Sequence, residues 1–352
     1  MEAGDIENLT MFNYSYEDYY DDGHVKYLCL ETFNFNTLSG AFFIVIFIFS
    51  LFGNTLLLCV LFIYENLKNV TNVFILNLAC SDLIFTGMLP FWAVNHLHHW
   101  IFGDFACKFK TALYYIGLYS SIILLTAMTV DRFITVVLHN SPRIPANRLR
   151  CAMVSCVAAW IISIAAAVSD AIKVEVVSSH WNSDLFCEDA SDKISLNLGY
   201  YLQVSLLFIL PFTIVVFCYS AILRTVLQAS NRKRYRTVVV VFCIVTAFFI
   251  CWGPYHIFIF TDAFYEPKGC YAIDRFNMAY YISRILAYSH CCLNPLLYML
   301  SQKLRRHLLQ LLKCNKDTRN HRERGNGLSS NVSHNVAFTT KSSAVMLDEP
   351  SK

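Results

Sequence analysis

Ionisable side chains stand at a few points along the apolar runs of this sequence, and their positions indicate what chemistry they can carry. Asp131 and Arg132 are adjacent and follow an apolar run that ends at Val130. Such a pair can be an interfacial helix end, with the Arg side chain extending to lipid headgroups. It can also be a latch between two conformations, because ionisable residues in lipid-buried segments are costly and commonly functional. The pair alone leaves both interpretations open.

A second group of polar side chains lies within the apolar runs themselves. Its members are Asn54, Asp82, Ser121, His290 and Asn294. An unpaired carboxylate at that depth needs a cation, and amide and hydroxyl oxygens beside it suit a small hard cation. Outside a cell we expect that cation to be Na⁺, with Asp82 as its charged ligand. A neutral, water-filled network of hydrogen bonds that joins the helices is an equal alternative.

Catalytic chemistry is not expected from this chain. The sequence shows no nucleophile–base set, no phosphate-binding loop and no zinc-ligand spacing. We therefore predict a protein that is not an enzyme, that has no cofactor other than an allosteric Na⁺, and that has no nucleic-acid partner.

The composition indicates a membrane protein. Of the 352 residues, 56% are hydrophobic and only 15% are charged, against roughly a quarter charged in soluble domains. A membrane-spanning helix needs about 20 mostly apolar residues. Seven runs meet this length, at residues 39–63, 73–94, 113–138, 151–168, 200–223, 237–260 and 278–300. We predict an all-α membrane protein, a seven-transmembrane helix bundle whose last span is the weakest because it contains Arg284, Ser289 and His290.

The distribution of basic residues sets the predicted orientation. The loops after the first, third and fifth runs and the segment after the seventh carry most Lys and Arg, whereas the N-terminal segment is acidic. Basic loops stay in the cytosol, so we expect a multi-pass plasma-membrane protein with an extracellular N-terminus and a cytoplasmic C-terminus. Its parts are an acidic, Tyr-rich N-terminus (1–37), the bundle (38–300), a short amphipathic eighth helix on the membrane surface (301–314) and a disordered cytoplasmic tail (315–352).

The predicted orientation determines which modification motifs lie outside the cell and which lie in the cytosol. Of the four Asn-x-Ser/Thr sequons, only Asn8 and Asn13 lie outside, so they are the candidate glycosylation sites. The extracellular cysteines are Cys29, Cys107, Cys187 and Cys270. These four cysteines permit three disulfide pairings. Cys314, at the end of the amphipathic helix, is a candidate for palmitoylation, and the hydroxyls of the tail are candidates for phosphorylation.

Prolines interrupt the later spans. Pro211, Pro254 and Pro295 lie near the middle of the fifth, sixth and seventh runs, and Pro90 lies near the end of the second. Each removes a backbone hydrogen bond and tends to kink its helix. The last three spans are therefore predicted to contain points at which they can pivot.

Short motifs occur about once per predicted span, in order along the chain. They are Gly53-Asn54, Leu78-Ala79-Cys80-Ser81-Asp82, Asp131-Arg132-Phe133, Trp160, Pro211, Cys251-Trp252-Gly253-Pro254 and Asn294-Pro295-Leu296-Leu297-Tyr298. In these motifs the chain resembles the rhodopsin-like G-protein-coupled receptors over about residues 38–314. The resemblance implies an activation switch made of Asp131, Arg132, Tyr219, Trp252, Pro254, Asn294, Pro295 and Tyr298.

Further strings narrow the resemblance to the chemokine receptors. Leu89-Pro90-Phe91-Trp92, the segment from Ser289 to Pro295, and the acidic, Tyr-rich N-terminus are similar to that family. Local strings such as the one from Leu118 to Ile122 resemble its XC branch. The chain departs from the usual pattern at three positions: Arg284 for Glu, Met88 for Thr and Phe133 for Tyr. Arg284 puts in doubt a ligand whose basic N-terminus needs Glu there, and the XC branch looks similar at this position.

The resemblance implies disulfides between Cys107 and Cys187 and between Cys29 and Cys270, and it implies a chemokine ligand. The candidate ligand-binding residues are Tyr14, Tyr16, Tyr19, Tyr20, Trp92, Tyr115, Asp170, Glu188, Tyr255, Asp262, Arg284 and Tyr288, with His96 and Tyr119 as further wall residues. The four N-terminal tyrosines stand beside acids, a setting typical of sulfation, and would attract a basic ligand. We expect Asp170, Asp262 or a ligand carboxylate to pair with Arg284.

The implied partners are an inhibitory-class heterotrimeric G protein, arrestin, receptor kinases and membrane lipid, with calcium signalling and chemotaxis as the outcome. A receptor for a non-chemokine peptide is the main alternative, and a chemokine scavenger that does not couple to a G protein is another. A transporter or channel would require repeated halves and a continuous polar path, and the sequence shows no internal repeat.

Overall fold

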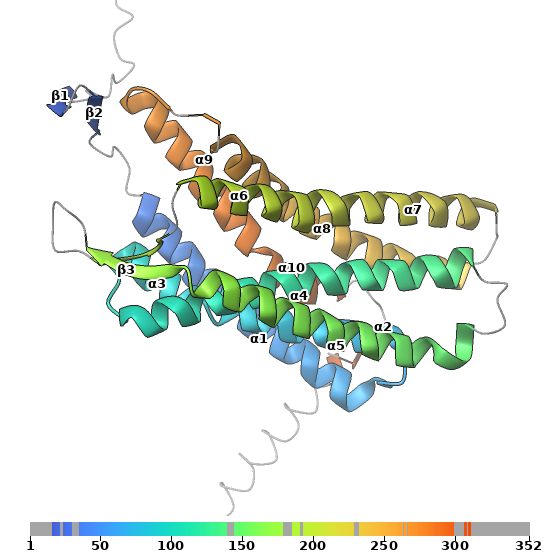
Figure 1. Cartoon of the computed structure of the whole chain (residues 1–352). Coiled ribbons are helices and arrows are strands. Elements are labelled where there is room, and N and C mark those ends of the chain that lie inside the picture. Colours follow the sequence, from blue (N-terminus) through green and yellow to red (C-terminus); the bar gives the residue numbers. More distant parts are fainter. Residues whose placement is uncertain are drawn as a thin grey trace, which may run out of the picture. The chain divides into compact units, whose positions relative to one another are not determined.

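A computed structural model gives the structure of the chain (Figure 1), and it describes residues 16–21, 24–29, 35–138, 144–178, 185–190, 193–228, 232–262, 264–265, 267–298, 306–307 and 309–310. The chain divides into two units, Met1–Leu308 and Leu309–Lys352. The predictions for Asn8, Asn13, Tyr14, Cys314 and the tail lie outside the described residues, as does most of the predicted eighth helix.

Seven successive helical spans make up the described part of the first unit (Figure 1). They are α1 (Phe35–Tyr64), α2 with α3 (Val70–Thr86 and Leu89–Leu97), α4 (Gly103–Val137), α5 (Ile144–Ala171), α6 with the π-helix η1 and α7 (Lys193–Val204, Ser205–Ile209 and Leu210–Gln228), α8 (Arg232–Asp262), and α9 with α10 (Cys270–Tyr288 and His290–Tyr298). Six spans are long and apolar enough to cross a membrane. The last is the most polar, as predicted, and the seven-helix bundle is confirmed.

Apolar side chains cover both faces of these helices. In α1, Phe43 and Leu61 are fully buried against the neighbouring helices, while Phe49 and Phe52 on the same helix are 65% and 66% exposed. A helix of a water-soluble bundle would carry polar residues on that outer face. The outer face of α1 therefore suits contact with lipid hydrocarbon.

Gly117 determines how closely α4 approaches α2. A Cβ atom built at Gly117 would lie 2.6 Å from the Cβ and 2.8 Å from the Cα of Phe85. Any larger residue would therefore push the two helices apart. Across the same contact, the Ser81 hydroxyl of α2 donates to the Gly117 carbonyl at 2.9 Å.

The prolines interrupt the spans in different ways. Pro90 stands in the first turn of α3, after α2 has ended at Thr86, and Pro211 is the second residue of α7, directly after the π-helical turn. Pro254 lies inside α8. The last span is interrupted at Ser289, between α9 and α10, and therefore before Pro295.

Pro295 nevertheless shapes the last span, because it leaves the Cys291 carbonyl without its helical donor. That carbonyl instead accepts hydrogen bonds from Asn54 Nδ2 at 2.9 Å and Ser50 Oγ at 3.4 Å. The backbone group released by the proline thus joins α10 to α1.

Two antiparallel hairpins complete the first unit: β1 (Tyr16–Asp21) with β2 (His24–Cys29), and β3 (Val174–Ser178) with β4 (Leu185–Asp189). The predicted disulfide between Cys107 and Cys187 is confirmed, and it joins β4 to the first turns of α4. Cys270 is also disulfide-bonded. The side chains of Cys29, Tyr16, Tyr19 and Tyr20 lie outside the described residues, so the pairing of Cys29 and the roles of these tyrosines stay predictions.

Candidate functional site

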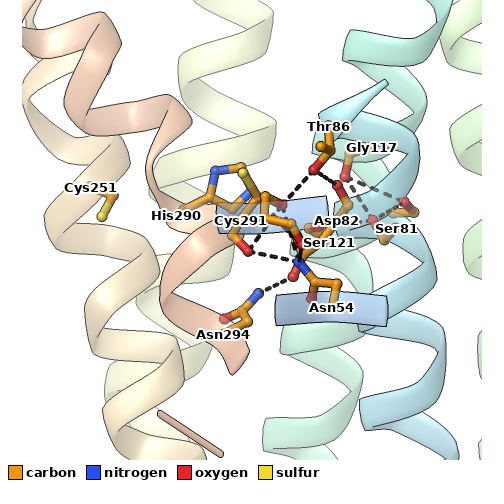
Figure 2. A network of polar contacts seen from close by, with 12 residues as sticks. Asn54, Ser81, Asp82, Thr86, Gly117, Ser121, Cys251, His290, Cys291 and Asn294 are labelled. Carbon is orange, nitrogen blue, oxygen red and sulfur yellow. Dashed lines mark hydrogen bonds and ion pairs between the residues drawn. The ribbon is translucent and has the colours of Figure 1, made fainter. Parts of the chain in front are cut away.

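The five predicted polar side chains gather where α1, α2, α4 and α10 meet, and all of them are buried (Figure 2). Asn294 Nδ2 donates to Asp82 Oδ2 at 2.7 Å. The Ser121 hydroxyl lies 2.8 Å from that of Ser81. Asn54 is joined to the cluster through the Cys291 carbonyl. Tertiary packing therefore assembles the group that the sequence spreads over four spans.

Three acceptors of this network lack a hydrogen-bond partner within the described part of the chain: Asp82 Oδ1, Asn54 Oδ1 and His290 Nε2. His290 Nδ1 lies 2.8 Å from the Ala287 carbonyl, which can only accept, so Nδ1 carries the proton. In the neutral ring Nε2 then presents a lone pair, 3.9 Å from Asp82 Oδ1. One carboxylate beside neutral acceptors is a donor set that fits a small hard cation such as Na⁺.

The network around Asp131 differs from the predicted pair of neighbours. Arg148, on α5, donates to both carboxylate oxygens of Asp131, with Nε and Nη2 each at 2.7 Å. Arg132 Nη2 lies farther away, at 3.3 Å from Asp131 Oδ2, and also donates to the Thr71 hydroxyl of α2. Asp131 is thus shared between two arginines. The bidentate pair with Arg148 has the stronger geometry.

Two tyrosines predicted to belong to the switch are buried near this region of the bundle. Tyr219 of α7 packs against Phe242 of α8, with ring centroids 4.9 Å apart. The hydroxyls of Tyr219 and Tyr298, like Arg132 Nε, have no hydrogen-bond partner among the described residues. Neither tyrosine is bonded to Arg132 in this arrangement.

Trp252 lies fully buried between the Asp82 network and the ring of Tyr288. Its ring centroid is 5.3 Å from that of His290, 6.1 Å from that of Phe85 and 6.4 Å from that of Tyr288. Pro254 follows two residues later in α8. Trp252 and Phe85 thus each contact the rings of both Tyr288 and His290.

Arg284 is 3% exposed and stacks on aromatic rings. Its guanidinium carbon lies 3.6 Å from the Trp92 ring centroid. Nε donates to the Tyr288 hydroxyl and Nη1 to the Tyr280 hydroxyl, each at 3.1 Å. Arg284, Trp92 and Tyr288 are therefore brought together as the sequence predicted, with Tyr280 as an unpredicted fourth member.

The expected pairing of Asp170 with Arg284 is wrong. Asp170 Oδ2 accepts from the Tyr119 hydroxyl at 2.5 Å, and Asp170 Oδ1 pairs with Lys173 at 3.0 Å. Asp170, Tyr119 and Tyr115 line a separate cavity of about 530 Å³ beside α6. Asp170 stands at the end of α5, which packs against α4, so α5 does not bring it to the last span.

The other predicted wall residues are more dispersed. Tyr255 packs between Trp252 and Tyr280, with centroid distances of 5.9 and 6.4 Å. Asp262 is the last residue of α8 and Glu188 lies on β4, and both are exposed. Neither carboxylate lies within 4.0 Å of Arg284 in the described structure. His96 stacks on Trp92 with centroids 5.5 Å apart.

Sequence reasoning missed Lys110 and Arg148 as site residues. Lys110 lies three residues before the predicted third run, but α4 begins earlier, at Gly103, and buries it. Arg148 was interpreted only as a cytosolic basic residue, because the fourth run was predicted from residue 151, whereas α5 begins at Ile144. In both cases the helix begins several residues before the apolar run and contains a charged residue in its first turns.

Comparison with known proteins identifies the family of this chain. Residues 53–298 match the family described as 7 transmembrane receptor (rhodopsin family). The chain is 37% identical over 317 residues to chemokine XC receptor 1 of Homo sapiens, covering 88% of this chain and 90% of that protein, and 37% identical over 311 residues to its counterpart in Mus musculus. It is 29% identical over 314 residues to C-C chemokine receptor type 8 of Homo sapiens, covering 88% of each. The chain, a receptor and not an enzyme, therefore belongs to the chemokine receptors of the rhodopsin family of seven-transmembrane receptors.

Proposed function

We propose that this receptor binds a chemokine at the outer end of the bundle and activates an inhibitory-class heterotrimeric G protein, which leads to calcium signalling and chemotaxis. The observation that carries the proposal is the burial of Arg132 and the contacts that hold it. Arg132 is buried and held by Asp131 and Thr71, while the hydroxyls of Tyr219 and Tyr298 are buried without a hydrogen-bond partner among the described residues. Such an arrangement favours a second state in which the arginine leaves its partners.

A chain of contacts connects the outer end to this switch. Arg284 bonds to Tyr288, whose ring packs on Trp252. Trp252 packs on His290, which faces Asp82. A ligand that prefers a different packing at Arg284 would shift the population of the whole bundle, because differential affinity is what moves a two-state equilibrium. Trp252 and Pro254 on α8 would supply the moving segment.

Orientation and partners complete the proposal. The acidic N-terminus, with Tyr14, Tyr16, Tyr19 and Tyr20, would lie outside the cell at the plasma membrane and attract a basic chemokine through its negative field. Sulfation of these tyrosines would strengthen that field. At the cytoplasmic end, receptor kinases would phosphorylate the tail and arrestin would bind it, and a palmitate on Cys314 would add contact with membrane lipid.

We also propose that Na⁺ binds at Asp82 in the inactive state. Asp82 Oδ1, Asn54 Oδ1 and His290 Nε2 would hold the ion, with Ser121 and Asn294 beside them. When bound, the ion would supply the positive charge that the buried carboxylate lacks. It would thereby restrain α1, α2 and α10 relative to one another.

The test uses cells that express the full chain with an N-terminal epitope tag. Purified chemokines are added one at a time, and suppression of cAMP and release of calcium are recorded with and without pertussis toxin. We expect at least one chemokine to give a toxin-sensitive response that is lost in Arg132→Ala at equal surface expression.

Two results would count against the proposal. A receptor that responds to an unrelated peptide and to no chemokine belongs to the non-chemokine alternative. Saturable chemokine binding and uptake without any G-protein response in the wild type would assign the chain to the scavengers.

A further inference from the structure

Two buried cations share one indole ring in the outer part of the bundle. Arg284 of α9 lies 3.6 Å from the centroid of Trp92, and Lys110 Nζ of α4 lies 4.2 Å from the same centroid. The two positive centres are therefore at most 7.8 Å apart, the sum of those distances. Arg284 is 3% exposed and Lys110 is 4% exposed. We name Lys110, Trp92 and Arg284 the cation cluster.

The other contacts of the cation cluster carry no negative charge. Lys110 Nζ donates to Cys187 Sγ at 3.3 Å and lies 5.1 Å from the Trp100 ring centroid. The hydrogen bonds of Arg284 go to two phenol hydroxyls. No carboxylate lies within 4.0 Å of either cation in the ranges that the structure describes. Aromatic faces and a disulfide sulfur stabilise a cation only partly.

One hydrogen-bond donor of the cation cluster, Trp92 Nε1, and one neighbouring neutral acceptor, His96 Nε2, are buried without a partner among the described residues. An indole N–H can only donate. Beside it, His96 Nδ1 lies 3.0 Å from Asn36 Oδ1, which can only accept, so the ring uses its proton there. A buried site with two cations and an unsatisfied N–H lacks an acceptor that carries negative charge.

Like charges at this separation repel, and burial strengthens the repulsion because the local dielectric constant is low. A single carboxylate bound beside the cation cluster would offset the repulsion, and it can accept from the indole N–H as well. Charge-assisted hydrogen bonds of this kind are about twice as strong as neutral ones. An ammonium group from a ligand would instead add a third positive charge.

We propose that the cation cluster binds a carboxylate of the ligand, namely an Asp or Glu side chain in the flexible N-terminal segment of the chemokine. The proposal rests on the proposed function and names the chemistry that the same site recognises. The receptor would select ligands by the acid that enters the bundle, while the acidic N-terminus of the receptor attracts the basic body of the chemokine.

The first test pairs receptor variants with ligand variants. The probe is a chemokine that activates the full chain, and each Asp and Glu before its first cysteine is changed singly to Asn or Gln. We expect one substitution to lower potency on the wild type by at least about 10-fold, the loss expected for one charged hydrogen bond. The same ligand variant should lose almost nothing further on Arg284→Gln or Lys110→Gln, because the interaction is already absent.

Two controls keep this test specific. Lys108→Gln removes a positive charge two residues earlier on α4, where Lys108 pairs with Asp104 on the helix surface, and should leave potency unchanged. Arg284→Lys keeps the positive charge. Replacing the acidic residue of the ligand should therefore lower potency more on Arg284→Lys than on Arg284→Gln. Equal losses from the ligand variant on the wild type and on Arg284→Gln, or no loss on either, would overturn the proposal.

The second test needs no chemokine. Purified full-length receptor is melted while acetate replaces methanesulfonate at constant Na⁺ and ionic strength. Acetate should raise the melting temperature of the wild type, as any ligand of the native state does, and should not raise that of the double variant Lys110→Gln/Arg284→Gln. If no chemokine signals, the proposed function is wrong, but the melting experiment still shows whether the cation cluster binds a carboxylate. Equal shifts in both proteins, or a larger shift with chloride than with acetate, would reject a carboxylate site.

Discussion

Asp131→Asn is the sharpest test of the switch, because this carboxylate holds two arginines at once. The side chains of Asp131, Arg132 and Arg148 are 12%, 9% and 27% exposed. At an effective dielectric constant of about 20, unit charges 3.3 Å apart attract by about 5 kcal/mol before desolvation. Desolvation removes most of that, and a hydrogen bond to a charged group retains a net value of about 1.5–3 kcal/mol.

Asparagine keeps the shape and one acceptor oxygen, so the substitution removes mainly the charge. A loss of about 1–2 kcal/mol from the inactive state raises the active population by roughly 5- to 30-fold. The assay measures suppression of cAMP without ligand, in cells with equal amounts of receptor on the surface. Cells treated with pertussis toxin give the baseline without G-protein coupling. The same variant should also bind G protein more readily in detergent.

Arg148→Gln is the matched control, since it removes the bidentate partner and leaves Asp131 charged. Asp131 can then pair fully with Arg132, now 3.3 Å away, so basal signalling should fall or stay the same. Unchanged basal signalling in Asp131→Asn would refute a restraining role for the carboxylate. Equal activation by both variants would show that the α4–α5 ion pair, and not the contact with Arg132, holds the inactive state.

Three further predictions concern the rest of the bundle. Raising Na⁺ tenfold at constant ionic strength should weaken agonist binding by up to about tenfold, and Asp82→Asn should abolish this dependence in a radioligand assay; retained dependence would exclude the proposed sodium site. Gly117→Ala should destabilise the purified receptor by about 1–3 kcal/mol, because the new Cβ would lie 2.6 Å from that of Phe85. The control is Gly199→Ala, whose new Cβ meets nothing within 4 Å. This variant should leave the melting temperature unchanged or raise it. Cys107→Ser should cost about 2–5 kcal/mol, seen as lower surface expression and a lower melting temperature; an unaffected variant would mean that the disulfide does not stabilise the fold.

Much of the architecture follows from local properties of the chain. Lipid requires each spanning backbone to satisfy its own hydrogen bonds, so seven apolar runs of helical length already predict seven helices. The low hydropathy of the last span is also predictable from the sequence, because Arg284 and His290 lie within it. The Asp82 group was predicted for the same reason: polar residues in apolar runs must meet one another.

Which residue each charged side chain pairs with depends on packing between segments that are distant in the sequence. Asp131 keeps the predicted contact with Arg132, but the packing of α5 against α4 also brings Arg148 to both of its oxygens. Asp170 is one of the three predicted alternatives for the partner of Arg284, but it accepts a hydrogen bond from the Tyr119 hydroxyl instead. Helix ends also matter, because α4 and α5 start several residues before their apolar runs. They therefore bury Lys110 and bring Arg148 to Asp131.

The residues of the chain therefore specify which side chains must find partners, since a buried charge or N–H is costly wherever it lies. Which partner each one finds is decided by interhelical distances and crossing angles, which no local pattern encodes. Arg284 illustrates both halves of this division. Its unusual charge is visible in the sequence. Its contact with the Trp92 ring that Lys110 also contacts, with no acid beside it in the described structure, arises only when α3, α4 and α9 pack together.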